Sequence, residues 1–111
     1  MAFYNKLHSY NEIESVIQEE NGLALFYFSS PDCGVCSVIK PKIQDLLKRY
    51  PVIRGYDINL KDDPLISGQL SLYSLPAVLV FSEGREVLRE ARFIVMDLLE
   101  PKITRLLGNI G

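Results

Sequence analysis

Two cysteines separated by two residues are the side chains of this 111-residue sequence best suited to chemistry. They are Cys33 and Cys36, in the segment Asp32-Cys33-Gly34-Val35-Cys36, and the sequence contains no other cysteine. Thiols at this spacing can close a disulfide across one helical turn. One of them can attack a disulfide of another molecule, and the other can then resolve the mixed disulfide. Gly34 leaves the outer sulfur accessible, so the pattern predicts dithiol–disulfide exchange.

The pair lies where a strand is expected to give way to a helix. Residues 23–28 form a continuous apolar run, which predicts a strand buried on both faces, and helical spacing predicts a helix over about residues 33–50. The first turn of a helix exposes unpaired N–H groups and carries a partial positive charge. This charge stabilises a thiolate, so we expect the pKa of the Cys33 thiol to fall below the free value of about 8.5.

A metal site and a purely structural pair are the alternatives to redox chemistry. Zinc prefers four ligands, and beyond the two cysteines the chain offers one histidine, His8, which we expect at a surface or a helix start. A single chain therefore cannot complete such a site, and we assign no metal ligand. A metal shared between two chains and two ordinary core cysteines stay open.

Composition narrows the function further. The chain has 12 Lys and Arg against 14 Asp and Glu, so its net charge of −2 argues against a nucleic-acid binder. Hydrophobic residues make up 48%, which excludes wholesale disorder, and the length predicts one domain over residues 1–111. No apolar run is long enough for a membrane span, and we see no signal-peptide pattern. We expect a cytoplasmic protein without nucleic-acid or membrane partners.

The remaining pattern predicts alternating helices and strands. Ser9-x-x-Glu12 is typical of a capping box that opens a helix, which Asn21-Gly22 ends. Pro41 within the long helix predicts a kink, and the neighbouring Lys40 and Lys42 are interpreted as part of a solvated face. We expect further elements at residues 52–58 (strand), 63–70 (helix opened by Asp63-Pro64), 76–81 and 85–91 (a hairpin), 97–107 (helix) and near 3–7 (short strand). The start of the last helix is ambiguous between Asp97 as the cap and Pro101 in the first turn.

This order predicts an α/β fold with a central mixed sheet of four to five strands and helices on both faces. Strands separated by helices favour a parallel core, to which the closing hairpin adds antiparallel strands.

Over residues 23–107 the sequence resembles the thioredoxin family. The resemblance is carried by the C-x-x-C that opens a helix, by Pro41 five residues after Cys36, by segments 59–64 and 81–84, and by Leu75-Pro76 before a strand. It implies a thioredoxin-like fold with Cys33 as the exposed nucleophile and Cys36 as the buried resolving thiol. It also implies a cis bond at Pro76 facing the cysteines and places Leu75 at the substrate groove.

The sequence departs from the family beside the dithiol. Asp32 stands where thioredoxins carry a tryptophan, and the chain contains no tryptophan at all. At about 7 Å and an effective dielectric constant near 40, its charge would cost the Cys33 thiolate roughly 1 kcal/mol. Val35 replaces the usual proline and changes the active-site turn.

Three further departures concern proton transfer and the substrate groove. Tyr27 takes the place of the family's buried acid, and Asp57 takes the place of a lysine. We hypothesise that Asp57, directly or through water, is the base for Cys36 and that it hydrogen-bonds to Tyr27. Alternatively Tyr27 is a strand aromatic and Asp57 a polar residue at a strand end. Arg92 replaces a glycine that flanks the groove, where it narrows the groove, attracts acidic partners, or is only a solvated hairpin residue.

The expected function is a thiol-disulfide oxidoreductase that reduces protein disulfides through Cys33 and Cys36. We expect a monomer without a bound cofactor, with electrons from an NADPH-dependent thioredoxin reductase or another thiol donor. A disulfide isomerase, a glutathione-linked exchanger, and a binding or regulatory module with non-catalytic cysteines are the alternatives.

Overall fold

The computed structural model describes residues 5–19 and 22–110. Strands and helices alternate along most of the chain. Its elements are β1 (Asn5–Leu7), α1 (Tyr10–Glu19), β2 (Leu23–Ser29), α2 (Gly34–Arg49), β3 (Arg54–Asn59), the 3-10 helix η1 (Leu60–Asp62), α3 (Leu65–Leu70), β4 (Ala77–Ser82), β5 (Arg85–Ala91) and α4 (Met96–Ile110). None of the helices in these two ranges is long and apolar enough to cross a membrane.

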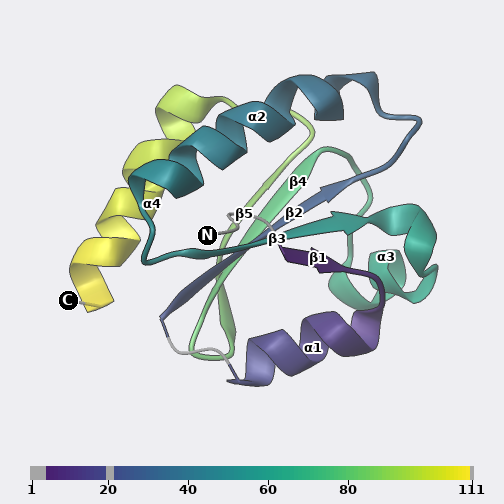
Figure 1. The fold of residues 1–111 in the computed structure, drawn as a ribbon, viewed down its shortest axis with the longest axis horizontal. Coiled ribbons are helices and arrows are strands. Elements are labelled where there is room, and N and C mark those ends of the chain that lie inside the picture. Colours follow the sequence, from purple (N-terminus) through teal and green to yellow (C-terminus); the bar gives the residue numbers. More distant parts are fainter. Residues whose placement is uncertain (1–4, 20–21, 111) are drawn as a thin grey trace.

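The strands form one five-stranded sheet in the order β1-β3-β2-β4-β5 (Figure 1). β1, β3 and β2 run parallel, whereas β4 is antiparallel to β2 and β5 is antiparallel to β4. The prediction of a mixed sheet with helices on both faces is confirmed. The expected parallel core consists of β1, β3 and β2, and the hairpin strands β4 and β5 add the antiparallel part, with β4 directly beside β2.

The direction of β4 follows from the edge of the sheet at which it begins. β2 and β3 are parallel and end at the same edge, and Ala77 at the start of β4 is the register partner of Phe28 near the end of β2. The segment through η1 and α3 therefore stays at that edge, and β4 runs back antiparallel to β2.

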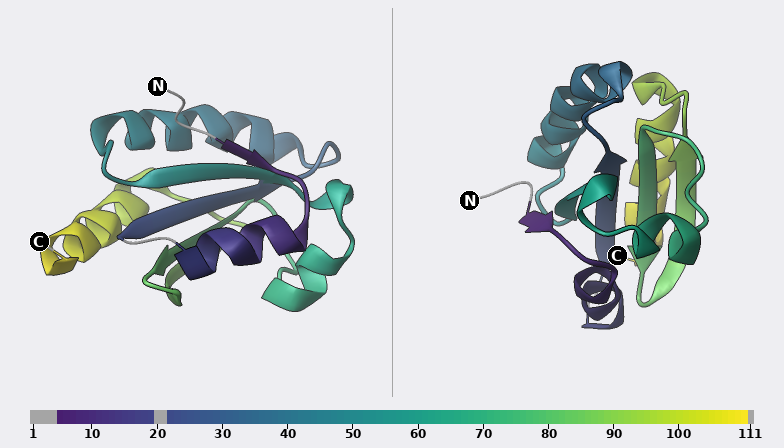
Figure 2. Two further views of the ribbon diagram at one scale, coloured as in Figure 1. Left: turned by 60° about the horizontal axis from the view of Figure 1, so that its bottom comes forward. Right: turned by 90° about the vertical axis from the view of Figure 1, so that its right-hand side faces the viewer.

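Each face of the sheet packs against its own pair of helices (Figures 1 and 2). β2 is buried along residues 23–28, and successive side chains point to opposite faces. Leu25 and Tyr27 join a hydrophobic core with α2 and α4, while Phe26 and Phe28 join a second core with α1 and α3. The strand that precedes the cysteines is therefore fixed from both sides.

Local sequence signals mark the start of α1 and the glycine after it, with one difference in the capping box. Ser9 Oγ accepts the Glu12 N–H at 3.1 Å, which confirms the predicted cap, but the Glu12 carboxylate accepts the N–H of His8 rather than that of Ser9. Gly22 has a φ of +84°, which suits a glycine after a helix. The predicted Asn21 stop and the first part of the predicted 3–7 strand lie outside the described residues.

α4 begins at Met96, with Asp97 in its first turn and Pro101 inside the helix. Neither of the two expected starts holds, because Asp97 lies in the first turn instead of at the cap and Pro101 lies further inside the helix. The Val95 carbonyl already accepts the N–H groups of Leu98 and Leu99, so the first turn is complete before the proline. Pro41 lies inside α2 as predicted, and the kink stays a prediction.

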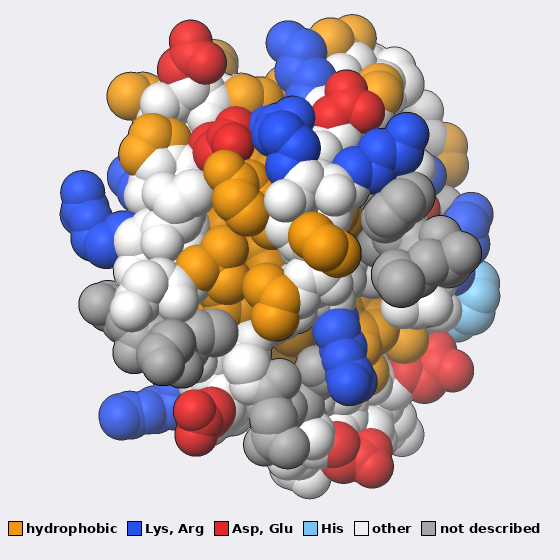
Figure 3. All heavy atoms as spheres, turned by 60° about the vertical axis from the view of Figure 1, so that its left-hand side comes forward, with side chains coloured by type: hydrophobic (Ala, Val, Ile, Leu, Met, Phe, Trp, Pro, Cys, Tyr) orange, Lys and Arg blue, Asp and Glu red, His pale blue; other side chains and the backbone are white. Residues whose placement is uncertain are grey.

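The surface carries charges of both signs. Figure 3 shows the side of the molecule on which α4 ends, where hydrophobic side chains gather near the middle and Lys, Arg, Asp and Glu are mixed around them. This distribution agrees with the small net charge of −2 and gives no extended basic surface on this face.

Candidate active site

The two cysteines form a disulfide at the junction between β2 and α2. Cys33 is the N-cap residue of α2, and its own N–H donates to the Ser30 carbonyl at 3.1 Å. Cys36 lies in the first turn, and its N–H donates to the Cys33 carbonyl at 3.2 Å, which brings the two Cα atoms to 5.4 Å. Cys33 is half-buried, whereas Cys36 is 3% exposed. The pair therefore combines an accessible outer cysteine with a protected inner one.

The charge beside Cys33 is balanced by a residue that the sequence reasoning missed. Asp32 Oδ2 pairs with Lys61 Nζ at 2.6 Å, and both side chains are exposed. Lys61 belongs to η1, directly after β3, and β3 is the parallel neighbour of β2. Because parallel strands end at the same edge of a sheet, this pairing could have been inferred. The ammonium offsets part of the cost that Asp32 was expected to impose on the thiolate.

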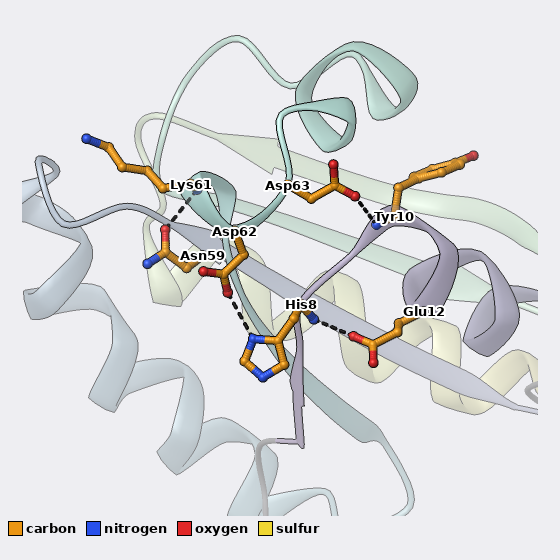
Figure 4. A network of polar contacts seen from close by, with 7 residues as sticks. All are labelled: His8, Tyr10, Glu12, Asn59, Lys61, Asp62 and Asp63. Atoms are coloured by element: carbon orange, nitrogen blue, oxygen red, sulfur yellow. Dashed lines mark hydrogen bonds and ion pairs between the residues drawn. The ribbon is translucent and has the colours of Figure 1, made fainter.

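Polar contacts hold the segment after β3 against the start of α1 (Figure 4). Asn59 Oδ1 accepts the Lys61 N–H at 2.9 Å, and Asp63 Oδ2 accepts the Tyr10 N–H at 2.7 Å. The exposed His8 contacts Asp62 through Nδ1 at 3.0 Å, which confirms its surface position. These contacts fix the backbone from which Lys61 reaches Asp32.

Tyr27 and Asp57 lie side by side as register partners on β2 and β3, but they bind different groups. The Tyr27 hydroxyl donates to the Cys36 carbonyl oxygen at 2.6 Å, and Asp57 Oδ2 accepts from Lys40 Nζ at 2.7 Å. A hydroxyl has one proton to donate, so the predicted bond from Tyr27 to Asp57 is replaced by the bond to Cys36. Burial, and secondarily the charge of Asp57, raise the pKa of the Tyr27 phenol, which excludes it as a base near neutral pH.

Lys40 was wrongly placed on a solvated face. Its side chain is 35% exposed and reaches the buried Asp57, whereas Lys42 is exposed as expected. Two residues correspond to about 200° around a helix, so the two lysines point in nearly opposite directions. The signal that could have found Lys40 is its spacing of four residues from Cys36, which places both on one face.

Two pockets have Lys40 in their lining. The first, which we call the disulfide pocket, has a volume of about 350 Å³ and includes Cys33 and Cys36 in its lining. The second, which we call the Asp57 pocket, has a volume of about 320 Å³ and includes Asp57 and His8. Ser29, Lys40 and Asn59 line both pockets.

The peptide bond between Leu75 and Pro76 is cis, as the resemblance implied. Pro76 is buried, and its carbonyl oxygen accepts the Arg92 N–H at 2.8 Å. Arg92 has a φ of +72°, a conformation that suits glycine, and its guanidinium lies 5.1 Å from the centre of the Phe93 ring. Leu75 packs against the core on the α1 side. A backbone hydrogen bond thus joins Arg92 directly to Pro76.

Gly34 and Val35 form the outer side of the active-site turn, and both are exposed. Apart from its chain neighbours and the backbone of its own helix, a Cβ atom on Gly34 would meet no atom within 4 Å, so the turn beside Cys33 faces open space. Within the described ranges, no three or more His, Cys, Asp or Glu side chains gather in a group that could hold a metal ion.

Comparison with known proteins decides the family. The family model for thioredoxin matches residues 5–95, which include the disulfide, the cis-proline and Arg92. The chain belongs to the thioredoxin family. With the disulfide-bonded C-x-x-C at the helix start, this thioredoxin-family protein is a thiol-disulfide oxidoreductase.

Curated relatives agree with this assignment, and solved structures share the fold. The chain is 36% identical over 99 residues to the thioredoxin-like protein YdfQ of Bacillus subtilis, covering 89% of this chain and 88% of that protein. It is 28% identical over 97 residues to a thioredoxin of Chlamydia trachomatis, covering 81% and 95%. Fasciola hepatica thioredoxin superposes with a TM-score of 0.82 at 25% identity, covering 90% and 96%. The oxidised mitochondrial thioredoxin 3 of Saccharomyces cerevisiae superposes with a TM-score of 0.80 at 21% identity, covering 92% and 94%.

Proposed function

We propose that this protein reduces disulfides in other proteins, with Cys33 as the nucleophile and Cys36 as the resolving thiol. The observation that carries the proposal is the asymmetry of the pair at the start of α2. Cys33 is half-buried at the N-cap, at the positive end of the α2 dipole, whereas Cys36 is 3% exposed. No acidic residue lies in the first turn of α2, so the helix start favours a thiolate on Cys33.

The reaction proceeds in two exchanges. The Cys33 thiolate attacks one sulfur of the target disulfide, the target S–S bond breaks, and the second target sulfur leaves as a thiolate. Cys36 then loses its proton and attacks Cys33. The bond between Cys33 and the target breaks, and the target leaves as a second thiol. The protein ends as the Cys33–Cys36 disulfide, having given two electrons to the target.

Asp57 is proposed as the base that takes the proton from Cys36, directly or through water. The support is its burial at 7% exposure and its contact with Lys40, which shares the disulfide pocket with Cys36. Replacing Asp57 by Asn should slow the turnover of a mixed disulfide on Cys33, whereas Asp45→Asn, on an exposed position of α2, should not. An unchanged turnover in Asp57→Asn would remove Asp57 from the mechanism.

The groove for the target is assigned to the residues around Cys33 and Pro76. An extended target segment would pair with the backbone at Leu75, next to the cis-proline. Arg92 would favour targets with an acidic residue nearby, since its guanidinium lies at the surface beside Phe93. The remaining proposed contacts are Asp32, Gly34 and Val35, all exposed around the outer sulfur.

The protein is further proposed to work as a cytoplasmic monomer without a bound cofactor. A reducing compartment would keep the dithiol ready for the first attack. Its electrons would come from an NADPH-dependent thioredoxin reductase or from another thiol donor.

Insulin reduction in the presence of dithiothreitol tests the proposal. The reduced protein should accelerate insulin precipitation well above the reagent alone, and Cys33→Ser should abolish the acceleration. Cys36→Ser should instead accumulate a mixed disulfide with the target. No acceleration by the intact protein would favour a binding or regulatory module, and a reduction potential near that of glutathione would favour an isomerase or glutathione-linked exchanger.

A further inference from the structure

The exchange reaction alone does not explain why Lys40 and Asp57 form a partly buried ion pair beside the site. Asp57 is 7% exposed, and its carboxylate accepts from Lys40 Nζ at 2.7 Å. Burying a carboxylate costs free energy unless a cation or hydrogen bonds compensate it. An apolar residue at position 57 would avoid that cost, so the retained charge is a candidate for a role in the chemistry.

Lys40 links the cysteines to this carboxylate. It follows Cys36 by four residues on α2, so the two side chains lie on the same helix face, and both line the disulfide pocket. Lys40 also lines the Asp57 pocket together with Asp57 itself. Its side chain therefore forms part of the wall between the resolving cysteine and the carboxylate.

The Asp57 pocket gives the carboxylate a route to water. Asp57 lines it although the residue is almost fully buried, and the pocket has room for several water molecules. Exposed residues, His8 and Lys6, stand at the same pocket. A proton received by Asp57 can leave by this route while a target protein covers Cys33.

We propose that Lys40 is a positioning residue that keeps the Asp57 carboxylate ionised and aimed toward Cys36, so that Asp57 can accept the Cys36 proton and release it through the Asp57 pocket. The inference rests on the proposed exchange function and deepens it. In the step concerned, the S–H bond of Cys36 breaks and its proton passes through pocket water to Asp57. The Cys36 sulfur then bonds to Cys33, and the target sulfur leaves with the electron pair of the broken bond.

Several titratable groups surround Asp57. Lys6 is its register partner on β1 and Tyr27 its partner on β2, while Lys40 reaches it from α2. The other charged or titratable residues at its pocket are His8 and Asp62. Lys40 contacts the carboxylate directly, with its Nζ 2.7 Å from Asp57 Oδ2, so its removal takes away the cation that compensates this buried charge.

The resolving step can be measured alone. Reduced protein is mixed with a slight deficit of dithiobis(nitrobenzoate). Cys33 takes one thionitrobenzoate and releases the other, and Cys36 then displaces the bound group in a phase whose rate does not depend on protein concentration. The rate of that phase is followed across neutral and alkaline pH. Lys40→Met should slow this phase about tenfold or more at pH 7 and shift the increase of its rate to higher pH. The reason is that burial without a compensating cation disfavours the charged form of a carboxyl group.

Matched variants separate this role from a structural one. Lys40→Arg keeps the cation and should restore the profile, and Lys42→Met removes a charge from the exposed side of the same helix and should leave it unchanged. Lys40 acts through Asp57, so Lys40→Met should cause no further slowing in an Asp57→Asn background. The double variant also lacks an unpaired buried charge, which protects it against misfolding.

Three results would overturn the proposal. One is a Lys40→Met profile with the same midpoint as the unaltered protein, and another is equal slowing by Lys40→Met in the presence and absence of Asp57. Absence of the concentration-independent phase in the unaltered protein would overturn the exchange function along with the role of Lys40. A normal phase in that protein with either of the first two results would overturn the role of Lys40 alone.

Discussion

At the scale of single residues, Tyr27 connects the sheet directly to the dithiol. Its hydroxyl donates to the Cys36 carbonyl at 2.6 Å, although the side chain otherwise packs in the core under α2. Burial, with a smaller contribution from the charge of Asp57, raises the pKa of the phenol above its ordinary value of 10.0. The protein therefore uses a tyrosine to position Cys36 and leaves proton transfer to other groups.

This raised pKa predicts a pH dependence of stability. Unfolded chains lose the phenol proton near pH 10, whereas the folded protein keeps it, so the free energy of unfolding should fall as pH rises above 10. Tyr27→Phe should cost about 1 kcal/mol at pH 7 through the lost hydrogen bond, and its stability should fall less above pH 10. Urea titrations across pH measure both, with the exposed Tyr73→Phe as the control. Parallel alkaline losses in Tyr27→Phe and in the unaltered protein would contradict the account.

The backbone conformation of Arg92 lowers the stability of the folded protein by a measurable amount. A side chain in the left-handed region is strained by about 1 kcal/mol relative to glycine. Arg92→Gly should therefore be about 1 kcal/mol more stable than Arg92→Ala in urea denaturation. Both variants remove the guanidinium, so their difference isolates the backbone. Equal stability of the two would show that no strain is relieved at this position.

At the scale of elements, Asp63 ties two helix starts together. Its Oδ1 accepts the Leu65 N–H at 3.0 Å at the start of α3, as the Asp63-Pro64 pattern predicted. Its Oδ2 accepts the Tyr10 N–H at the start of α1, a contact between residues 53 positions apart that local sequence does not reveal. These two backbone hydrogen bonds lower the pKa of the carboxyl.

Acid should therefore weaken the junction between α1 and α3. A carboxyl with a lowered pKa in the fold stabilises the protein above its unfolded pKa, and this contribution is lost as pH falls through the folded value. Asp63→Asn should lower the urea midpoint at pH 7 more than Asp45→Asn does, and the gap should close as pH falls through the lowered pKa of Asp63. A gap that persists in acid would mean that the carboxylate charge is not the source of the stability.

Features that depend on neighbouring residues could be predicted from the sequence, whereas contacts between residues far apart in the chain could not. The apolar run at 23–28, the Ser9 cap and the C-x-x-C at a helix start depend on neighbouring residues, and each was predicted correctly. The direction of β4 depends on the edge of the sheet at which the chain re-enters after α3, and hydrophobic periodicity does not show that edge. The pairs Asp32–Lys61 and Lys40–Asp57 depend on which strand ends and helix faces meet in space. Lys40 was hidden because it was grouped with Lys42 as a charged run.

At the scale of the whole molecule, two hydrophobic cores share one sheet. Ile43 of α2 and Ile66 of α3 are both fully buried, on opposite faces. Removing one methyl group from each, as Ile43→Val and Ile66→Val, should cost about 0.5–1.5 kcal/mol apiece. Residues without shared neighbours combine additively, so the double variant should lose the sum within about 0.5 kcal/mol in equilibrium urea denaturation.

The unfolding curves also test how tightly the two faces are coupled. Because β2 contributes to both cores, each variant should unfold in one transition by near- and far-ultraviolet circular dichroism. Separate transitions for the two signals, or a double variant far from the sum, would contradict a sheet that holds both faces as one unit.

The most direct test of the account is the alkylation of the reduced protein by iodoacetamide across pH, with each cysteine followed by mass spectrometry. The account predicts that Cys33 reacts rapidly with a midpoint clearly below the value of about 8.5 for a free thiol, while Cys36 stays protected. Cys33→Ser and Cys36→Ser assign the two rates. Two thiols that both react as slowly as free cysteine at neutral pH would contradict it.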